Sequence, residues 1–577
     1  MEKRRKKEVQ TPATPADVSP VAVLEEWTPL GRCLEARIAQ AAWLQTGADL
    51  LLSGQLPTAG HDSGTMAAHG AQLLAAWCAE RLSAGDLPQE IVLVELGIGT
   101  GTHLRGLLES FRRVCLAGGH DWFARLVVFA TDISPSVIQL ALDHQVFAVH
   151  GARVRVGLMD ARLPGLFREH ETQTVFDLRG RIHAVWGHYV LDALPVDIYR
   201  QQGDAWEIAA LRTEVPDVPA WEQATQLPLA DGQSLAADGT VESALRVSGG
   251  QLLTHLQLRM LPFALADHPD ATELARAATE QRAALGADHV LLVEGTVLHH
   301  PVGALRMLPE LRAALAPTGF AVLRDVGLVT PEAAAQSRLP QRFGRTLAMP
   351  VSFVQLDGWH AAHGQADLWL APADDGLRDH ATRLLTQRPL PQTSTAFSRL
   401  FSGPALNTAR SHVDLARLQT EPAAALEAWR QAALAEPDDW LILQEAAEKA
   451  LEVGQLQLGL ALAARGLELN PVTSPTLWRL AGTAHALLGE ATEAEVALRQ
   501  GLAIAPTDAG LHLALARLAA DLDEIPTTFR HLGEALAGDR AGLWRETALS
   551  LLDAVLRADE RQRQAEDAAW KIRFSAE

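Results

Sequence analysis

Glycines that follow a short apolar run are the first feature of this sequence suited to binding a ligand. The run Ile91–Leu96 is followed by Gly97, Gly99 and Gly101, and then by a helical pattern. A glycine turn between a strand and a helix lets a ligand approach the backbone amides at the helix N-terminus. The spacing differs from the dinucleotide fingerprint, because Thr102 stands where that fingerprint needs glycine. No Lys-Ser/Thr pair follows, which excludes a Walker loop.

An acidic residue stands at or near the end of this apolar run and of each of the next two apolar runs. Glu95 would repel a pyrophosphate but attract the ammonium of an amino-acid group. Asp132 can accept both hydroxyls of a ribose, and Asp160 can accept the exocyclic amine of an adenine. Together they predict a site for S-adenosyl-L-methionine; the alternative is that Asp132 and Asp160 only cap the following helices. The predicted cofactor-binding residues are Glu95, Gly97, Gly99, Gly101, Asp132, Ile133, Asp160 and Ala161.

Strand-like and helix-like patterns alternate through the first part of the chain. Short β-branched apolar runs are typical of strands buried on both faces of a parallel sheet. Their alternation with helices predicts an α/β Rossmann-like domain, with an open, mostly parallel sheet and helices on both faces. The expected helices are 32–52 and 65–82, and the expected strands are 91–96, 126–132, 154–160, a run from His183, and 319–327.

The glycine turn and its carboxylates resemble those of class I S-adenosylmethionine-dependent methyltransferases over about residues 85–330. A closer resemblance lies in HAVWGHYVLDALPVDIYR, which begins at His183 and holds an intact Asp-Ala-Leu-Pro run at 192–195; Trp206 and Glu207 follow. These residues resemble the MidA-like branch, which includes mitochondrial complex I assembly factors that methylate a protein arginine. The resemblance implies a methyltransferase fold with S-adenosyl-L-methionine as cofactor.

One dipeptide departs from the MidA-like pattern. Gly187-His188 occupies the place of Asn-Glu, and a neutral histidine cannot pair with a guanidinium as a carboxylate does. The resemblance therefore does not imply that the methyl acceptor is an arginine. We expect His188 to contact or deprotonate the acceptor and Asp192 to orient the acceptor or the histidine. The alternative is that His188 bonds backbone carbonyls in the turn and Asp192 caps a helix.

From about Leu415 the sequence is rich in alanine and leucine and repeats with a period near 34 residues. Such a period, with small residues at helix crossings, resembles tetratricopeptide repeats. It predicts an all-α solenoid; an unrelated helical bundle is the alternative. The residues that recur in phase are Pro437, Pro471 and Pro506, Ala447, Ala481 and Ala516, Ala425, Gly459 and Ala494, and the turn glycines Gly454 and Gly489.

The chain is acidic and contains few cysteines. Its 577 residues carry 50 Lys and Arg against 70 Asp and Glu, a net charge of −20, so we expect no nucleic-acid partner. No apolar run is long enough to cross a membrane, and three distant cysteines form no disulfide framework, which favours a cytoplasmic location. His299-His300 lacks a third ligand at a suitable spacing, so we expect a loop pair at the edge of the fold and no metal.

These patterns divide the chain into three parts. The expected parts are a disordered basic tail over 1–25, the methyltransferase domain over 26–410 and the repeats over 411–577. Within the domain we expect a core over 85–330, an insertion at about 200–290 and a substrate-side segment over 331–405.

The repeats suggest how a substrate would be held. Residues 411–577 carry 26 acidic and 15 basic side chains, so the array should favour basic peptide segments. We expect it to capture a protein or peptide substrate near the cofactor, and its removal to leave cofactor binding intact. Two alternatives stay open: a small-molecule methyltransferase whose repeats serve assembly, for example as a homodimer, and a non-catalytic repeat scaffold.

Overall fold

The computed structural model divides the chain into two units, each with its own sheet. Unit 1 consists of residues 1–45, 192–305 and 328–363, and unit 2 of residues 46–191, 306–327 and 364–577. The structure describes residues 21–52, 64–202, 205–238, 252–264, 297–335, 339–343, 346–363, 365–372, 380–403, 408–539 and 542–574.

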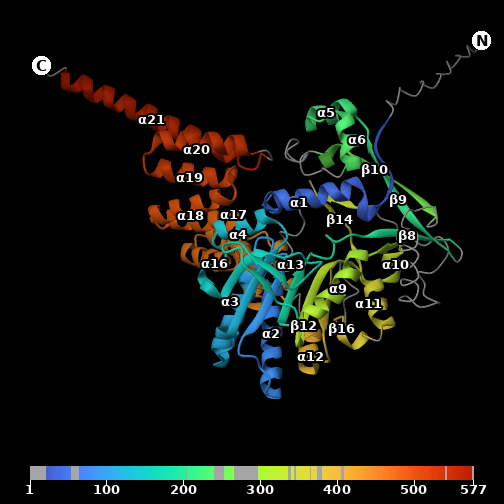
Figure 1. The fold of residues 1–577 in the computed structure, drawn as a ribbon. Coiled ribbons are helices and arrows are strands. Elements are labelled where there is room, and N and C mark those ends of the chain that lie inside the picture. Colours follow the sequence, from blue (N-terminus) through green and yellow to red (C-terminus); the bar gives the residue numbers. More distant parts are fainter. Residues whose placement is uncertain are drawn as a thin grey trace, which may run out of the picture. The chain divides into compact units, whose positions relative to one another are not determined.

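The sheet of unit 2 contains five adjacent parallel strands (Figure 1). In spatial order its strands are β16 (Trp369–Leu370), β17 (His380–Thr386), β12 (Leu315–Leu328), β7 (Ile182–His188), β2 (Ile91–Leu96), β3 (Leu126–Asp132), β4 (Val154–Leu158), β5 (Leu166–Glu169) and β6 (Val175–Asp177). Strands β12 to β4 pair in parallel, and the outer strands pair antiparallel. The predicted open, mostly parallel sheet is confirmed.

Helices pack against this sheet through a large apolar core. They are α2 (Thr65–Ala84), α3 (Thr102–Gly118), α4 (Pro135–Asp143) and α12 (Pro391–Leu400). Trp77 of α2 is fully buried, and its Nε1 donates to the carbonyl of Thr318 at 2.7 Å. The buried carboxylate of Glu80 accepts from the amide and the hydroxyl of Thr393, at 2.9 and 2.6 Å. These bonds tie α2 to the sheet and to the start of α12.

The apolar runs of the sequence located the central strands well. The expected strands 91–96 and 126–132 coincide with β2 and β3, because nearly every residue in them is buried. The third run ends at Leu158, so Asp160 follows the strand. The antiparallel pair β5 and β6 comes next, where the alternating pattern predicts a helix.

Unit 1 is centred on an antiparallel sheet. Its strands are β1 (Ala22–Pro29), β8 (Asp197–Gln202), β9 (Ala205–Val215), β10 (Gln257–Ala264) and β11 (Val297–His300). The expected tail 1–25 lies outside the described residues over 1–20, and its last four residues belong to β1. The expectation of a histidine loop pair at the fold edge is wrong. His299 and His300 are buried in β11, which pairs with β8, because apolar neighbours extend that strand through them.

The other elements before the repeats range from a helix of 19 residues to a strand of two. They are α1 (Leu34–Leu52), α5 (Val218–Thr225), α6 (Leu229–Asp238), α9 (Val302–Ala314), α10 (Pro331–Ala334), α11 (Phe353–Ala362), β13 (Gln341–Phe343), β14 (Thr346–Ala348) and β15 (Val351–Ser352). The expected insertion 200–290 includes β9, α5, α6 and β10, and its parts 203–204, 239–251 and 265–290 lie outside the described residues. No described helix combines the length and apolar character needed to cross a membrane.

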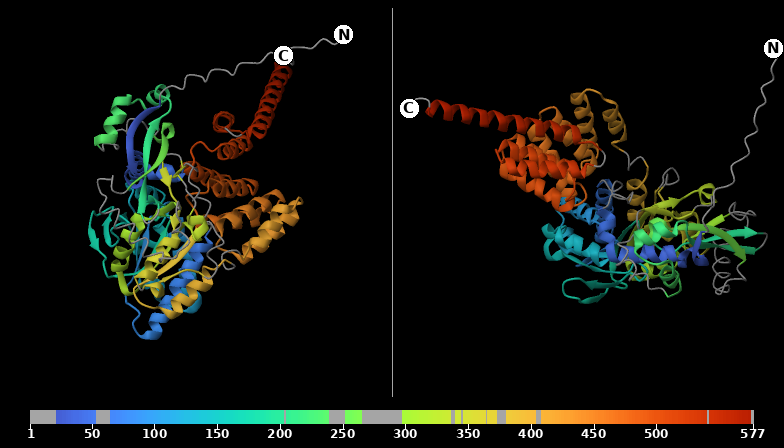
Figure 2. Two further views of the ribbon diagram at one scale, coloured as in Figure 1. Left: turned by 90° about the vertical axis from the view of Figure 1, so that its right-hand side faces the viewer. Right: turned by 90° about the horizontal axis from the view of Figure 1, so that it is seen from above.

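Successive paired helices form the C-terminal part of unit 2, which confirms the predicted all-α solenoid (Figures 1 and 2). Gly454 and Gly489 turn the chain between paired helices with φ of +76° and +81°, which favours glycine. The helices are α13 (Arg410–Leu418), α14 (Pro422–Ala435), α15 (Trp440–Glu452), α16 (Leu456–Leu469), α17 (Pro475–Leu487), α18 (Ala491–Ile504), α19 (Ala509–Asp521), α20 (Ile525–Gly538) and α21 (Arg545–Phe574).

Small residues let these helices approach closely. A Cβ at Gly466 would lie 2.7 Å from Leu477, and a Cβ at Gly501, 35 residues later, would lie 2.7 Å from Leu511. The recurring glycine therefore marks a repeated helix contact rather than a flexible site.

We expect Gly501→Val to lower the free energy of unfolding by about 1–3 kcal/mol, because the side chain overpacks the contact with Leu511. Chemical denaturation followed by circular dichroism measures the change. Gly533→Ala in α20 is the control: its Cβ meets nothing within 4 Å, so it should stabilise the helix by up to about 1 kcal/mol. Equal stability of both variants would contradict the close contact.

Candidate functional site

The loop after β2 is a left-handed glycine turn at the carboxyl ends of the parallel strands. Gly97, Gly99 and Gly101 have φ of +69°, +53° and +77°, which residues with a side chain rarely adopt. A Cβ at Gly101 would also come within 2.9 Å of Val146 and Phe147. Close packing therefore requires glycine here, and the turn leads directly into the N-terminus of α3.

Hydrogen bonds hold this turn against the end of β3. The amide of Ile98 donates to the carbonyl of Thr131 at 2.8 Å, and the Thr131 hydroxyl donates to the carbonyl of Glu95 at 2.6 Å. Asp132 comes next and is 2 % exposed. One of its oxygens accepts from the amide of Ser134 at 2.9 Å, so it also steadies the start of α4. The glycine turn and Asp132 are thus brought together.

Asp160 lies two residues beyond the end of β4 and is paired within its own loop. Both of its oxygens accept from the Arg162 guanidinium, at 2.7 to 3.0 Å, and Oδ1 also accepts from the Arg162 amide. Burial alone would raise the pKa of Asp160, but these bonds outweigh it and the pKa lies below its usual value. Ile133 and Ala161 are half-buried beside their aspartates. A ligand bound at Asp160 would share that carboxylate with Arg162.

Three titratable side chains from three elements meet beside the glycine turn. Oε1 of Glu95, on β2, lies 2.6 Å from Nδ1 of His103, on α3. The His103 ring lies edge-on to that of His188, at the end of β7, with 4.0 Å between ring centroids. One donor atom of each lies within 4.8 Å of the other two. The sequence analysis identified Glu95 and His188 but missed His103.

The two expected catalytic residues have shifted pKa values. Burial lowers the pKa of His188 well below its usual value, and the positive charges of His103 and Arg324 add to this effect. His188 is therefore a neutral imidazole at neutral pH. Asp192 begins a segment of unit 1, and desolvation raises the pKa of its carboxyl group to about 7.

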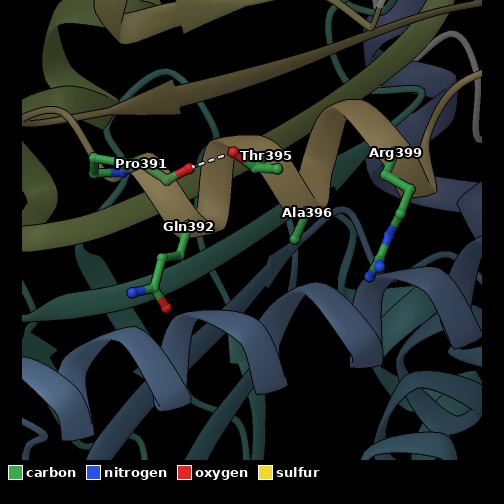
Figure 3. Close-up of a pocket in the computed structure, with 5 residues that line it drawn as sticks. All are labelled: Pro391, Gln392, Thr395, Ala396 and Arg399. Atoms are coloured by element: carbon green, nitrogen blue, oxygen red, sulfur yellow. Dashed lines mark hydrogen bonds between the residues drawn. The ribbon is translucent and has the colours of Figure 1, made fainter.

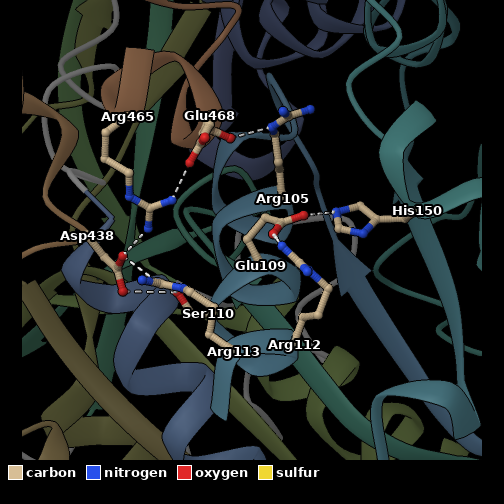
Figure 4. Close-up of polar contacts among 9 residues, drawn as sticks. All are labelled: Arg105, Glu109, Ser110, Arg112, Arg113, His150, Asp438, Arg465 and Glu468. Atoms are coloured by element: carbon tan, nitrogen blue, oxygen red, sulfur yellow. Dashed lines mark hydrogen bonds and ion pairs between the residues drawn. The ribbon is translucent and has the colours of Figure 1, made fainter. Parts of the chain in front are cut away.

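Further along α3, Ser110 and Arg113 bond this helix to the repeats within unit 2 (Figure 4). Asp438, in the loop between α14 and α15, accepts from Arg113 and from Ser110, both on α3. Arg465 of α16 donates to the same carboxylate at 2.6 Å. Asp438 is only 8 % exposed, so a largely buried carboxylate joins two arginines that are partly exposed.

A second set of bonds lies nearer the glycine turn. Arg105 of α3 donates to the carbonyl of Glu468 at 2.7 Å and to that of Val146 at 2.6 Å (Figure 4). The Thr102 hydroxyl donates to the buried side chain of Asn470 at 3.4 Å. The first residues of α3 therefore contact both the segment under Gly101 and the repeats. Removal of the repeats should disturb this helix, contrary to the expectation that cofactor binding would be unaffected.

A shallow groove elsewhere in unit 2 carries no titratable cluster. It is lined by one face of α12: Pro391, Gln392, Thr395, Ala396 and Arg399 (Figure 3). Strand β17 runs antiparallel to β12, so α12 starts at the amino ends of the parallel strands. The glycine turn lies at their carboxyl ends, where ligands of such sheets bind.

The residues at that edge fit the expected cofactor. The glycines of the turn have no side chains that would shield its backbone amides from a ligand. Two largely buried carboxylates, Glu95 and Asp132, stand at the carboxyl ends of the adjacent strands β2 and β3. Such a donor set suits a cationic amino-acid group and a ribose and disfavours phosphates. A mostly parallel sheet with this edge has the architecture of the class I methyltransferases.

The comparisons with known proteins agree. Residues 73–372 match the family model described as "Putative S-adenosyl-L-methionine-dependent methyltransferase", and the chain belongs to that family, Methyltransf_28. S-adenosyl-L-methionine is the cofactor of that family. No curated protein matches the chain.

Two groups of solved structures are similar to parts of the chain. A COG1565 superfamily member from Burkholderia thailandensis, bound to S-adenosyl-homocysteine, is 19 % identical; the match covers 65 % of this chain and 91 % of that one, with a TM-score of 0.39. MamA from Desulfovibrio magneticus RS-1 is 16 % identical over 27 % of this chain and 97 % of its own, with a TM-score of 0.22.

We expect Asp438→Asn to lower the melting temperature and to weaken S-adenosyl-homocysteine binding by about 0.5–2 kcal/mol, because Arg113 of α3 and Arg465 of α16 both lose their ion pair with this carboxylate. Calorimetric titration of the full chain measures the affinity. Asp414→Asn is the control, since Asp414 pairs with Arg410 on an exposed helix face. An Asp438→Asn protein with a lower melting temperature but an unchanged affinity for S-adenosyl-homocysteine would show that α3 does not transmit the lost contact to the cofactor site.

Proposed function

We propose that this methyltransferase transfers the methyl group of S-adenosyl-L-methionine to a protein or peptide that its repeats capture. The observation that carries the proposal is the bonding of the repeats to α3, the helix that starts at the glycine turn. A substrate held by the repeats would thereby be kept within reach of the cofactor. Glu95 and Asp132 would hold its ammonium and ribose, and the turn its carboxylate.

The first helix of each repeat pair contributes to a surface whose acidic side chains favour a basic substrate. Helix α15 packs against α17, and α17 against α19, so these helices form one side of the array. Burial raises the pKa of Glu445 on α15, and the neighbouring Glu448 raises it further. Two acidic groups this close would gain from a cationic partner, as would the net acidic composition of the array.

Methyl transfer into a cell lysate tests the main proposal. With a methyl-labelled cofactor, we expect label in macromolecules after separation by size. Asp132→Asn should reduce it at least tenfold, because one charge-assisted hydrogen bond contributes about 1.5–3 kcal/mol. Asp143→Asn, at the exposed end of α4, is the matched control. Label confined to small metabolites would contradict capture, and failure to bind S-adenosyl-homocysteine would favour a non-catalytic scaffold.

Charge reversal on the array tests the role of the repeats. We expect Glu448→Lys to raise the apparent KM for a labelled protein several-fold and to leave the affinity for S-adenosyl-homocysteine unchanged, because the affected charge lies on α15. Glu427→Lys, on the exposed face of α14, is the control. Equal KM values for the two variants would exclude this surface as the site of capture.

A further inference from the structure

Glu95, His103 and His188 form a largely buried group beside the glycine turn, in which Glu95 is the only member that the cofactor site also uses. Glu95 is 2 % exposed and His103 is 8 % exposed, whereas His188 is half-buried. The three side chains come from β2, α3 and β7 and converge where β2 and β7 end side by side. His188 is therefore the member of the group that an incoming molecule can reach, and His103 and Glu95 lie behind it.

The contact between Glu95 and His103 fixes which ring nitrogen carries the proton. At 2.6 Å, Nδ1 of His103 donates to the Glu95 carboxylate, which is a charge-assisted hydrogen bond between buried groups. A carboxylate that orients an imidazole in this way also stabilises positive charge nearby.

The same distance argues against a shared metal ion. Two atoms bound to one ion at about 2.0–2.2 Å usually lie about 3 Å or more apart. Glu95 Oε1 and His103 Nδ1 are closer than that and are suitably placed to share a proton.

We propose that Glu95 and His103 are a positioning pair for His188, which takes the proton from a neutral N–H or O–H acceptor during methyl transfer. This inference rests on the proposed function. The acceptor lone pair bonds to the methyl carbon, the carbon–sulfur bond breaks with both electrons going to sulfur, and the acceptor proton moves to His188. The edge-on contact with His103 holds the His188 ring in place, and Glu95 offsets the charge that the ring gains.

The charges around His188 also define the acceptor class. The groups that face it are His103 from α3, Glu95 from β2 and Arg324, its register partner on β12. Arg324 would repel a permanently charged guanidinium at this point. A neutral acceptor becomes acidic once it gains a methyl group, so even a weak base such as His188 can remove its proton.

Histidine NMR on the full chain tests the group without reference to activity. With ring-labelled histidine, and His188→Gln to assign its signal, we expect the pKa of His188 to rise in His103→Asn, which keeps a donor for Glu95 but removes a positive neighbour. We expect it to fall in Glu95→Gln, which removes the negative charge. Shifts in opposite directions support the positioning pair, and an unchanged His188 titration in both variants overturns it.

Two further measurements extend the test. The pH profile of methyl transfer should shift in the same directions as the titration, and hydrolysed labelled protein should contain no methylarginine. Label in methylarginine, or one equivalent of bound metal that both His103→Asn and His188→Gln lose, overturns the inference. A chain that transfers no methyl group would refute the proposed function, while the NMR titration would still decide whether the three side chains interact as described.

Discussion

Helix α3 is held at its start, along its buried side and along its outer side. Its first turn follows Gly101, which packs against Val146 and Phe147 without room for a side chain. Its inner face carries His103 to the carboxylate of Glu95, and its outer face carries Arg105 to the carbonyl of Glu468. Because a helix moves largely as one body, a shift on any of these sides is passed to the others. The catalytic edge and the repeats therefore share one structural element.

The sequence was informative where a single physical requirement determined the residue type. Continuous apolar runs marked β2 and β3 because strands buried on both faces admit few polar residues, and the glycines marked positive φ. The period of 34 to 35 residues located helix contacts of the array, since the in-phase residues Ala447 and Ala481 are buried between packed helices. These signals are local or periodic and need no three-dimensional information.

Other features depend on residues that only the fold brings together. His103 lies one residue inside α3 and reads as an ordinary helical position; its meaning comes from β7, which ends 85 residues later. Asp438 reads as a loop residue of a repeat and is instead the centre of a network with α3. The pair β5 and β6 also broke the expected alternation, because a strand can be followed by a hairpin as readily as by a helix.

One contact restricts how such a chain can be recombined. A Cβ at Gly64, just before α2, would lie 1.7 Å from the carbonyl of Asp438. The loop between α14 and α15 thus packs directly against the backbone at Gly64, and no side chain lies between them that could move to accept a different loop. A foreign solenoid grafted at residue 411 would need to reproduce this loop to seat correctly. In evolution, the array and the enzyme core are expected to be inherited as one piece rather than exchanged as modules.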